Sequence, residues 1–180
     1  TNTDSLADGN LVNYLFNKTG GAHADSVTIV IASAILSHAS SDFPLLIASS
    51  REVLGTTTTY LFVAGSLTPD NTTEVTRQRT FRADSTLDKL RVYVSEDITV
   101  GSNPVVRTRK NLANGAQSVT ITGTGGFEDT TNSESVVAAD EVNYQYDATG
   151  VTSGDCTVRI IQLRSASTAL QHVCGGSIQT

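Results

Sequence analysis

From Thr57 onward, the sequence consists of short apolar runs that alternate with clusters of glycine, asparagine, aspartate and serine. In several runs the apolar residues recur at every second position, as in 90–94 (LRVYV) and 142–146 (VNYQY). A period of two places neighbouring side chains on opposite faces of a strand, so one face of each run is predicted to be buried. No window from Thr57 onward carries a sustained apolar stripe at helical spacing. Roughly eight short strands at this spacing predict an all-β fold, a jelly-roll β-sandwich.

One hairpin turn can be placed from its dipeptide. Asn114-Gly115 lies between two strand-like runs, 104–110 and 119–122. Both central residues of a type I′ turn need positive φ, which asparagine and glycine adopt most easily. We therefore predict a tight turn at this dipeptide.

The first part of the chain has a different pattern. Residues 1–56 contain apolar runs without a clean period of two, and we predict a less regular N-terminal arm there. The sandwich domain is predicted over 57–165 and a C-terminal hairpin or tail over 166–180. The longest apolar stretch, 27–36, is too short to cross a bilayer as a helix. Its residues Val27, Ile29 and Ile31 would suit a strand that adds to the sheet edge of a neighbouring subunit.

The charge balance argues against one large class of partner. The formal net charge of the 180 residues is −6, whereas binding of nucleic-acid phosphates needs a surplus of basic side chains. Only 17% of the residues are charged and 38% are hydrophobic, and threonine, serine and glycine fill the difference. This composition favours strands and turns. We expect neither a nucleic acid nor a membrane as a partner.

Side chains that could carry chemistry are scattered along the chain. His23, His38 and His172 have no metal-ligand spacing with a cysteine or a carboxylate. The adjacent carboxylates at 128–129 and 140–141 would point to opposite faces of a strand, so neither pair makes an acid–base dyad. We predict no catalytic residue, no metal site and no cofactor, and therefore a protein that is not an enzyme.

The only two cysteines are Cys156 and Cys174. If the intervening chain forms a hairpin centred on Ser165, the two cysteines face each other, and opposed strand residues come close enough for a disulfide. Two buried or free thiols are an equal alternative. A bridge between subunits is a third.

Two pairs of arginines occupy alternating positions. Arg77 and Arg79 lie in a strand-like run over 74–82, and Arg107 and Arg109 lie in the run 104–110. The spacing predicts that the members of each pair share one strand face. Two basic stripes on an acidic protein would suit contact with an acidic neighbouring subunit. Alternatively, they belong to a solvated sheet face whose charges prevent edge-to-edge pairing.

Residues 60–161 resemble a jelly-roll domain of virion structural proteins from tailed phages and related viruses. The matching segments occur in the family's order: 87–94 (LDKLRVYV), 106–111 (VRTRKN), 118–121 (SVTI), and 129–133 (DTTNS) leading into 136–142 (VVAADEV). The chain departs from the family at Asp140-Glu141, where Gly-Asp is usual. These motifs are structural rather than catalytic.

The resemblance implies a component of the virion surface that is synthesised in the host cytoplasm. Such jelly rolls commonly form trimers, so the implied partners are copies of the chain itself and the major capsid protein or other virion subunits. We expect first a capsid decoration (cement) protein whose arginine pairs and arm contact the capsid. The alternatives are a receptor- or glycan-binding fibre head, with Tyr93, Tyr144 or Tyr146 as an aromatic platform, and an extracellular filament subunit that exchanges its arm strand.

Overall fold

A computed structural model of the chain describes residues 33–34, 45–65, 67, 72–166 and 173–174. In these residues the fold is all-β, as predicted, with antiparallel strand pairs and one short turn of 3-10 helix. The elements are β1 (Ser33–Ala34), β2 (Leu45–Leu54), β3 (Thr59–Leu61), η1 (Glu74–Thr76), β4 (Arg79–Thr80), β5 (Ser85–Asp97), β6 (Val100–Gly101), β7 (Val105–Lys110), β8 (Ala113–Thr120), β9 (Gly125–Val136), β10 (Glu141–Asp147), β11 (Val151–Ser153), β12 (Cys156–Ala166) and β13 (Val173–Cys174).

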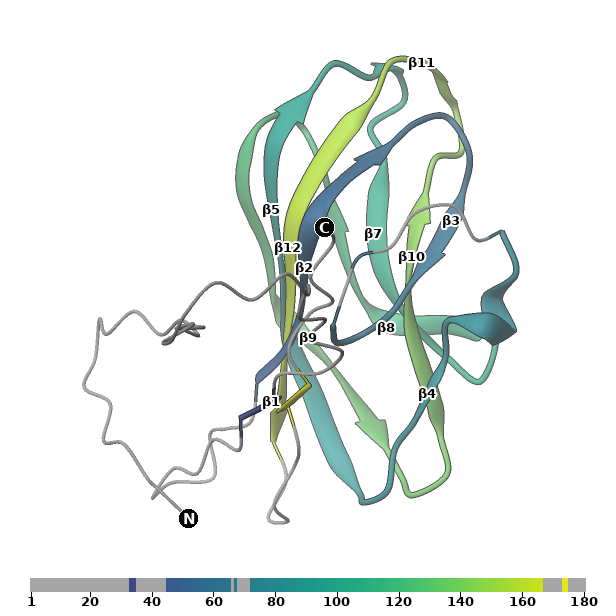
Figure 1. Cartoon of the computed structure of the whole chain (residues 1–180), viewed down its shortest axis with the longest axis vertical. Coiled ribbons are helices and arrows are strands. Elements are labelled where there is room, and N and C mark those ends of the chain that lie inside the picture. The colour runs from purple at the N-terminus through teal and green to yellow at the C-terminus, as the bar shows by residue number, and fades with distance from the viewer. Residues whose placement is uncertain (1–32, 35–44, 66, 68–71, 167–172, 175–180) are drawn as a thin grey trace, which may run out of the picture.

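Most of these strands belong to two sheets that enclose one hydrophobic core, as in a β-sandwich (Figure 1). One sheet has the strand order β2-β12-β5-β9. The other has the order β3-β10-β7-β8, and β4 also pairs with β10. Strands β6 and β11 form a separate two-stranded ribbon, and β1 pairs with β13.

Strand β5 shows why the sequence folds into such layers. Leu90, Val92 and Val94 are fully buried, whereas Arg91 and Tyr93 between them are exposed. The predicted alternation is therefore confirmed in this strand, and residues 142, 144 and 146 of β10 are likewise buried. Full burial of a valine or leucine side chain stabilises the fold by about 1.5–3 kcal/mol. The alternate apolar residues of these strands thus form part of the core.

Strands β3 and β4 lie in line along the same edge of β10. Leu61 of β3 pairs with Tyr144, and Arg79 of β4 pairs with Val142. Together they lie along one edge of the sheet, and η1 comes between them in the chain. The predicted continuous strand over 74–82 is therefore wrong in its first part, because residues 74–76 form a helical turn.

The expected boundary of the N-terminal arm also needs correction. Strand β2 lies within the range 1–56, yet it pairs with β12 from one end to the other and belongs to the sandwich. The sandwich therefore includes residues from Leu45 onward. At the other end, β12 reaches Ala166, close to the predicted limit at 165. The arm residues Val27, Ile29 and Ile31 lie outside the described residues.

The predicted hairpin between β7 and β8 exists, but its turn lies earlier in the chain. Lys110 pairs with Ala113, so Asn111 and Leu112 form a two-residue loop with φ of 50° and 67°. These are the positive φ values of a type I′ turn. The Asn-Gly dipeptide at 114–115 lies inside β8 instead.

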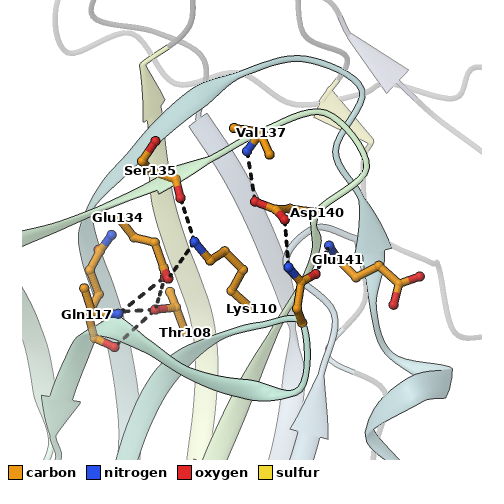
Figure 2. Close-up of polar contacts among 10 residues, drawn as sticks. Thr108, Lys110, Gln117, Glu134, Ser135, Val137, Asp140 and Glu141 are labelled. Atoms are coloured by element: carbon orange, nitrogen blue, oxygen red, sulfur yellow. Dashed lines mark hydrogen bonds and ion pairs between the residues drawn. The ribbon is translucent and has the colours of Figure 1, made fainter.

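Contacts with the β9–β10 connection explain where the turn forms (Figure 2). The side-chain amide of Asn111 donates to the Asp140 carboxylate at 2.7 Å, and its oxygen accepts the Glu141 backbone N–H at 2.9 Å. The Asn111 backbone N–H also donates to the Glu141 carbonyl at 2.8 Å. Asp140 is held in turn by the Val137 N–H at 2.9 Å. Tertiary contacts at Asn111 thus override the local turn signal.

We expect Leu112→Gly to stabilise the protein by about 0.5–1 kcal/mol. A non-glycine residue at φ of 67° is strained by Cβ, and the side chain of Leu112 is half exposed, so its removal costs little packing. The greater chain entropy of glycine in the unfolded state offsets part of the gain. The measurement is the urea midpoint at constant m-value. Leu112→Ala keeps the strain and is the control, and equal midpoints for the two variants would contradict the prediction.

Candidate interaction surface

The outer face of β7 presents two of the predicted arginines together. Arg107 and Arg109 alternate with the buried residues Val106 and Thr108, so they share one face, as expected. On β10, Gln145 pairs with Arg107 and Asn143 pairs with Arg109.

Both β7 arginines bind carboxylates of the same chain. Arg107 contacts Asp147 at 2.6 Å, and Arg109 contacts Glu74 of η1 through two bonds of 2.8 and 2.9 Å. The hydrogen bond to Glu74 raises the pKa of Arg109, although burial acts against it. Hydrogen bonds from Thr149 and the charge of Arg107 lower the pKa of Asp147. The positive charge of this stripe is therefore largely neutralised within the subunit.

The other predicted pair, Arg77 and Arg79, does not share a strand, because Arg77 follows η1 and only Arg79 lies in β4. Both guanidinium groups nevertheless stack on one aromatic ring, at 4.8 and 4.2 Å from the centroid of Phe62. A cation over an aromatic face gains about 0.5–2 kcal/mol, depending on how far it is desolvated. The ring therefore holds two positive groups at fixed positions.

The two arrangements form one continuous surface, which we call the arginine face. Its members are Phe62, Glu74, Arg77, Arg79 and Arg109. Glu74 connects them, because its carboxylate binds Arg109 and its backbone carbonyl accepts the Arg77 N–H at 2.9 Å. The residue after Glu74, Val75, is 61% exposed. The arginine face can therefore offer both an apolar contact and the exposed guanidinium of Arg79 to an acidic partner.

Sequence reasoning did not find Phe62 or Glu74. Glu74 meets Arg109 from 35 positions away, and Phe62 meets Arg79 across the interruption between β3 and β4. No local pattern joins them, because the aromatic residues at 60 and 62 precede the arginines at 77 and 79 with no aromatic or basic residue between the two pairs.

The hairpin expected between the cysteines is wrong. Strand β12 passes Ser165 and ends at Ala166, and Cys156 at its start is paired with Leu54 of β2 on one side and Asp97 of β5 on the other. Cys156 is a buried free thiol near the start of that strand. Burial raises its pKa to about 12, and the charge of Asp97 adds to this effect. Cys174 lies in β13, opposite Ser33, so the predicted cross-strand pairing of the two cysteines does not occur.

The tyrosines differ sharply in exposure. Tyr144 and Tyr146 are fully buried, and burial raises the pKa of both hydroxyls, so neither belongs to an exposed platform. Tyr93 is 48% exposed on the outer face of the other sheet. It lines a groove of about 210 Å³ together with Arg91, Ile160 and Gln162.

A second hollow of about 360 Å³ is lined by residues 54–57, Thr59 and 154–155. Inside the protein, Thr59 pairs with Tyr146 across β3 and β10, and both hydroxyls are buried without a hydrogen-bond partner among the described residues. Ordered water commonly satisfies such groups in a polar cavity. The lining of this hollow is mostly polar and includes Thr56, Thr57, Thr59 and Asp155.

Within the part of the chain that the structure describes, no three histidine, cysteine, aspartate or glutamate side chains gather as a metal site. Over the same residues, no helix has the length and apolar character needed to span a membrane.

Comparisons with known proteins give no family. No model of a protein family matches the chain. Searches of curated proteins and of solved structures also found no match. The function must therefore be argued from the strand order and the surfaces described above.

Proposed function

We propose that the sandwich is a jelly roll. With β3 and β4 counted as one strand and the two-stranded ribbons left aside, the strands in chain order are β2, β3/β4, β5, β7, β8, β9, β10 and β12. Numbered one to eight, they form sheets of order 1-8-3-6 and 2-7-4-5. The pairs 1–8, 2–7, 3–6 and 4–5 are nested, as when one long hairpin is wrapped into two sheets. This nesting is the jelly-roll arrangement.

We infer that the chain is a virion structural protein, and that its role is capsid decoration. The nested strand order is the observation that carries this proposal. The resemblance of residues 60–161 to virion jelly rolls supports it from the sequence. A jelly roll alone does not specify a function, so the contact surface provides the second support.

The arginine face is the proposed contact with the capsid. Arg79 is exposed and held on Phe62, so little side-chain entropy is lost when an acidic group of the capsid binds it. Val75 would add apolar area beside it. Many copies, each a trimer, would then bridge neighbouring capsid subunits with an avidity greater than the affinity of one contact.

The test is binding to capsids from which the protein has been stripped. We expect Arg79→Glu to weaken binding at least about tenfold, because like charges oppose each other across the contact. Arg159→Glu is the matched control, since Arg159 is an exposed arginine on the other sheet. Equal loss in both variants would point to overall charge rather than to the arginine face. Full binding by Arg79→Glu would refute this face as the contact.

The filament alternative makes a different prediction about solution mass. Deletion of residues 1–44 removes the arm and keeps β2 in the sandwich. A discrete trimer that survives this deletion supports decoration. Open-ended polymers that fall apart to monomers on deletion would instead support donor-strand exchange.

A further inference from the structure

The groove around Tyr93 lies on the outer face of the sheet β2-β12-β5-β9, away from the arginine face on the other sheet. Its lining comes from two neighbouring strands, β5 and β12. Strand β9 borders it on the other side of β5. The sheet therefore sets the spacing of the side chains that line the groove. Neighbouring strands are about 4.8 Å apart, and alternate residues of one strand are about 6.6 Å apart.

The strand register arranges this face in two rows. In the first row, Tyr93 lies between Gly126 of β9 and Ile160 of β12. In the second row, one alternate position away, Arg91 lies between Glu128 and Gln162. An apolar row with an aromatic ring is thus parallel to a row of planar polar groups.

Gly126 borders the groove without lining it, and the guanidinium group of Arg91 extends from the second row over this glycine. A Cβ at this position would meet only Arg91, whose side-chain nitrogens would be 3.6 and 3.8 Å away. In the described part of the chain, the side chains of Arg91, Glu128 and Gln162 take part in no hydrogen bond or ion pair. Their donors and acceptors therefore face solvent beside an open ring face.

We propose that this groove binds one unit of a neutral saccharide. The C–H groups of a pyranose ring stack on the negative face of an aromatic ring, here Tyr93. Sugar hydroxyls both donate and accept, and the second row supplies donors from Arg91, an acceptor in Glu128 and both in Gln162. Because Arg91 and Glu128 carry opposite charges and are opposed in register, the row favours a neutral ligand over an anionic one.

The small volume limits the affinity of a single site. At about 210 Å³ the groove is below the range of about 300–1,000 Å³ typical of pockets that enclose a ligand. We expect a dissociation constant on the order of 1 mM for one site. Repetition of the site on an oligomer or a particle would lower the apparent dissociation constant through avidity. This activity is independent of the decoration role and would be compatible with either a cement protein or a fibre head.

The experiment has two stages and uses the full chain. Protein displayed in many copies on beads is first screened against neutral and acidic oligosaccharides of equal length. The strongest neutral binder is then titrated into ¹⁵N-labelled protein, and we expect shifts at residues 91, 93, 126, 160 and 162. Tyr93→Ala and Gly126→Val should each weaken binding at least about tenfold, the first by removing the ring and the second by displacing the Arg91 guanidinium that lies over Gly126. Tyr93→Phe keeps the ring and should bind.

Several outcomes would overturn the proposal. They are the absence of any neutral binder in the screen, a preference for acidic oligosaccharides, or shifts that lie outside the groove. Binding that survives both Tyr93→Ala and Gly126→Val would do the same. Far-ultraviolet circular dichroism of each variant shows that it is folded. Capsid binding of Tyr93→Ala should be unchanged. This measurement distinguishes failure of the saccharide proposal from failure of the decoration proposal.

Discussion

Replacing Gly115 by alanine is expected to lower the free energy of unfolding by about 2–3 kcal/mol. Gly115 does not need positive φ, since it lies in the extended strand β8. Its constraint is space: a Cβ would overlap the carboxylate of Glu134 and the hydroxyl of Thr108, and would come within 3.0 Å of the Thr108 carbonyl.

Hydrogen bonds and an ion pair hold the side chains that surround Gly115 (Figure 2). The side chain of Glu134 is 9% exposed and lies 3.7 Å from the amine of Lys110. Its carboxylate also accepts from the Thr108 hydroxyl at 3.4 Å. Lys110 is held in turn by the Ser135 carbonyl at 2.9 Å. Moving Glu134 aside would therefore separate a nearly buried carboxylate from its partners, which is costly.

The measurement for Gly115→Ala is thermal and urea unfolding beside a matched glycine. Gly126 also lies in a strand with ordinary φ, but its surroundings are open. Gly126→Ala should change stability by less than about 0.5 kcal/mol. Gly115→Ala should lower Tm by roughly 5–10 °C for a chain of this size. Similar effects in the two variants would mean that strand propensity, rather than close contact, determines the cost.

Gly115 also shows where the sequence was informative and where it was not. The dipeptide at 114–115 correctly indicated a hairpin, but the glycine is required for packing rather than for the turn. The turn itself forms at Asn111, whose partners Asp140 and Glu141 lie about 30 positions away. Local preference identifies the kind of element, whereas long-range contacts decide its register.

The difference between local preference and long-range contacts also explains which other predictions succeeded and which failed. The alternation in β5 was readable because one side of that strand faces the core along its length. The run around Arg77 and Arg79 could not be read, because its strand is shared with β3 and is interrupted by a helical turn. The hairpin between the cysteines failed because β12 continues through Ser165, where nothing local marks a turn.

The candidate sites were the least predictable features. The alternation of Arg107 and Arg109 gave their common face, but not the carboxylates that neutralise them. Tyr93 was recognised as an aromatic residue on a half-buried strand, but its neighbours Gly126 and Ile160 follow only from the register of three strands. Register depends on the whole sheet, so no local window contains it.

Asp129→Asn is expected to destabilise the protein by about 2–3 kcal/mol at pH 7. The carboxylate is only 6% exposed and accepts the backbone N–H groups of Ser118 at 3.0 Å, Thr131 at 3.2 Å and Asn132 at 3.0 Å. It thereby stabilises an irregular stretch of β9 next to Lys89, where the register with β5 shifts, and ties β9 to β8. An asparagine amide nitrogen cannot accept these bonds.

The pH dependence identifies the charge as the cause. Burial alone would raise the pKa of Asp129, but the hydrogen bonds from Asn132, Ser118 and Thr131 lower it to about 2, from an ordinary value of 3.8. The pKa of Asp129 is lower in the folded protein than in the unfolded chain. The ionised carboxylate therefore contributes its full stabilisation at pH values above the unfolded-state pKa, and this stabilisation is lost as the pH falls through the folded-state pKa. The shift corresponds to about 2 kcal/mol. The stability gap between wild type and Asp129→Asn should therefore be constant above about pH 5 and shrink between about pH 4 and pH 2.

Urea unfolding of both proteins across this pH range measures that gap directly, because the titration of every other carboxylate cancels in the difference. Glu128→Gln is the control: Glu128 is adjacent but exposed, so its replacement should change stability by less than about 0.5 kcal/mol at any pH. A gap that stays constant down to pH 2 would show that the shape of the side chain, and not its charge, stabilises β9. A shrinking gap would instead show that the irregular β9 stretch depends on an ionised carboxylate.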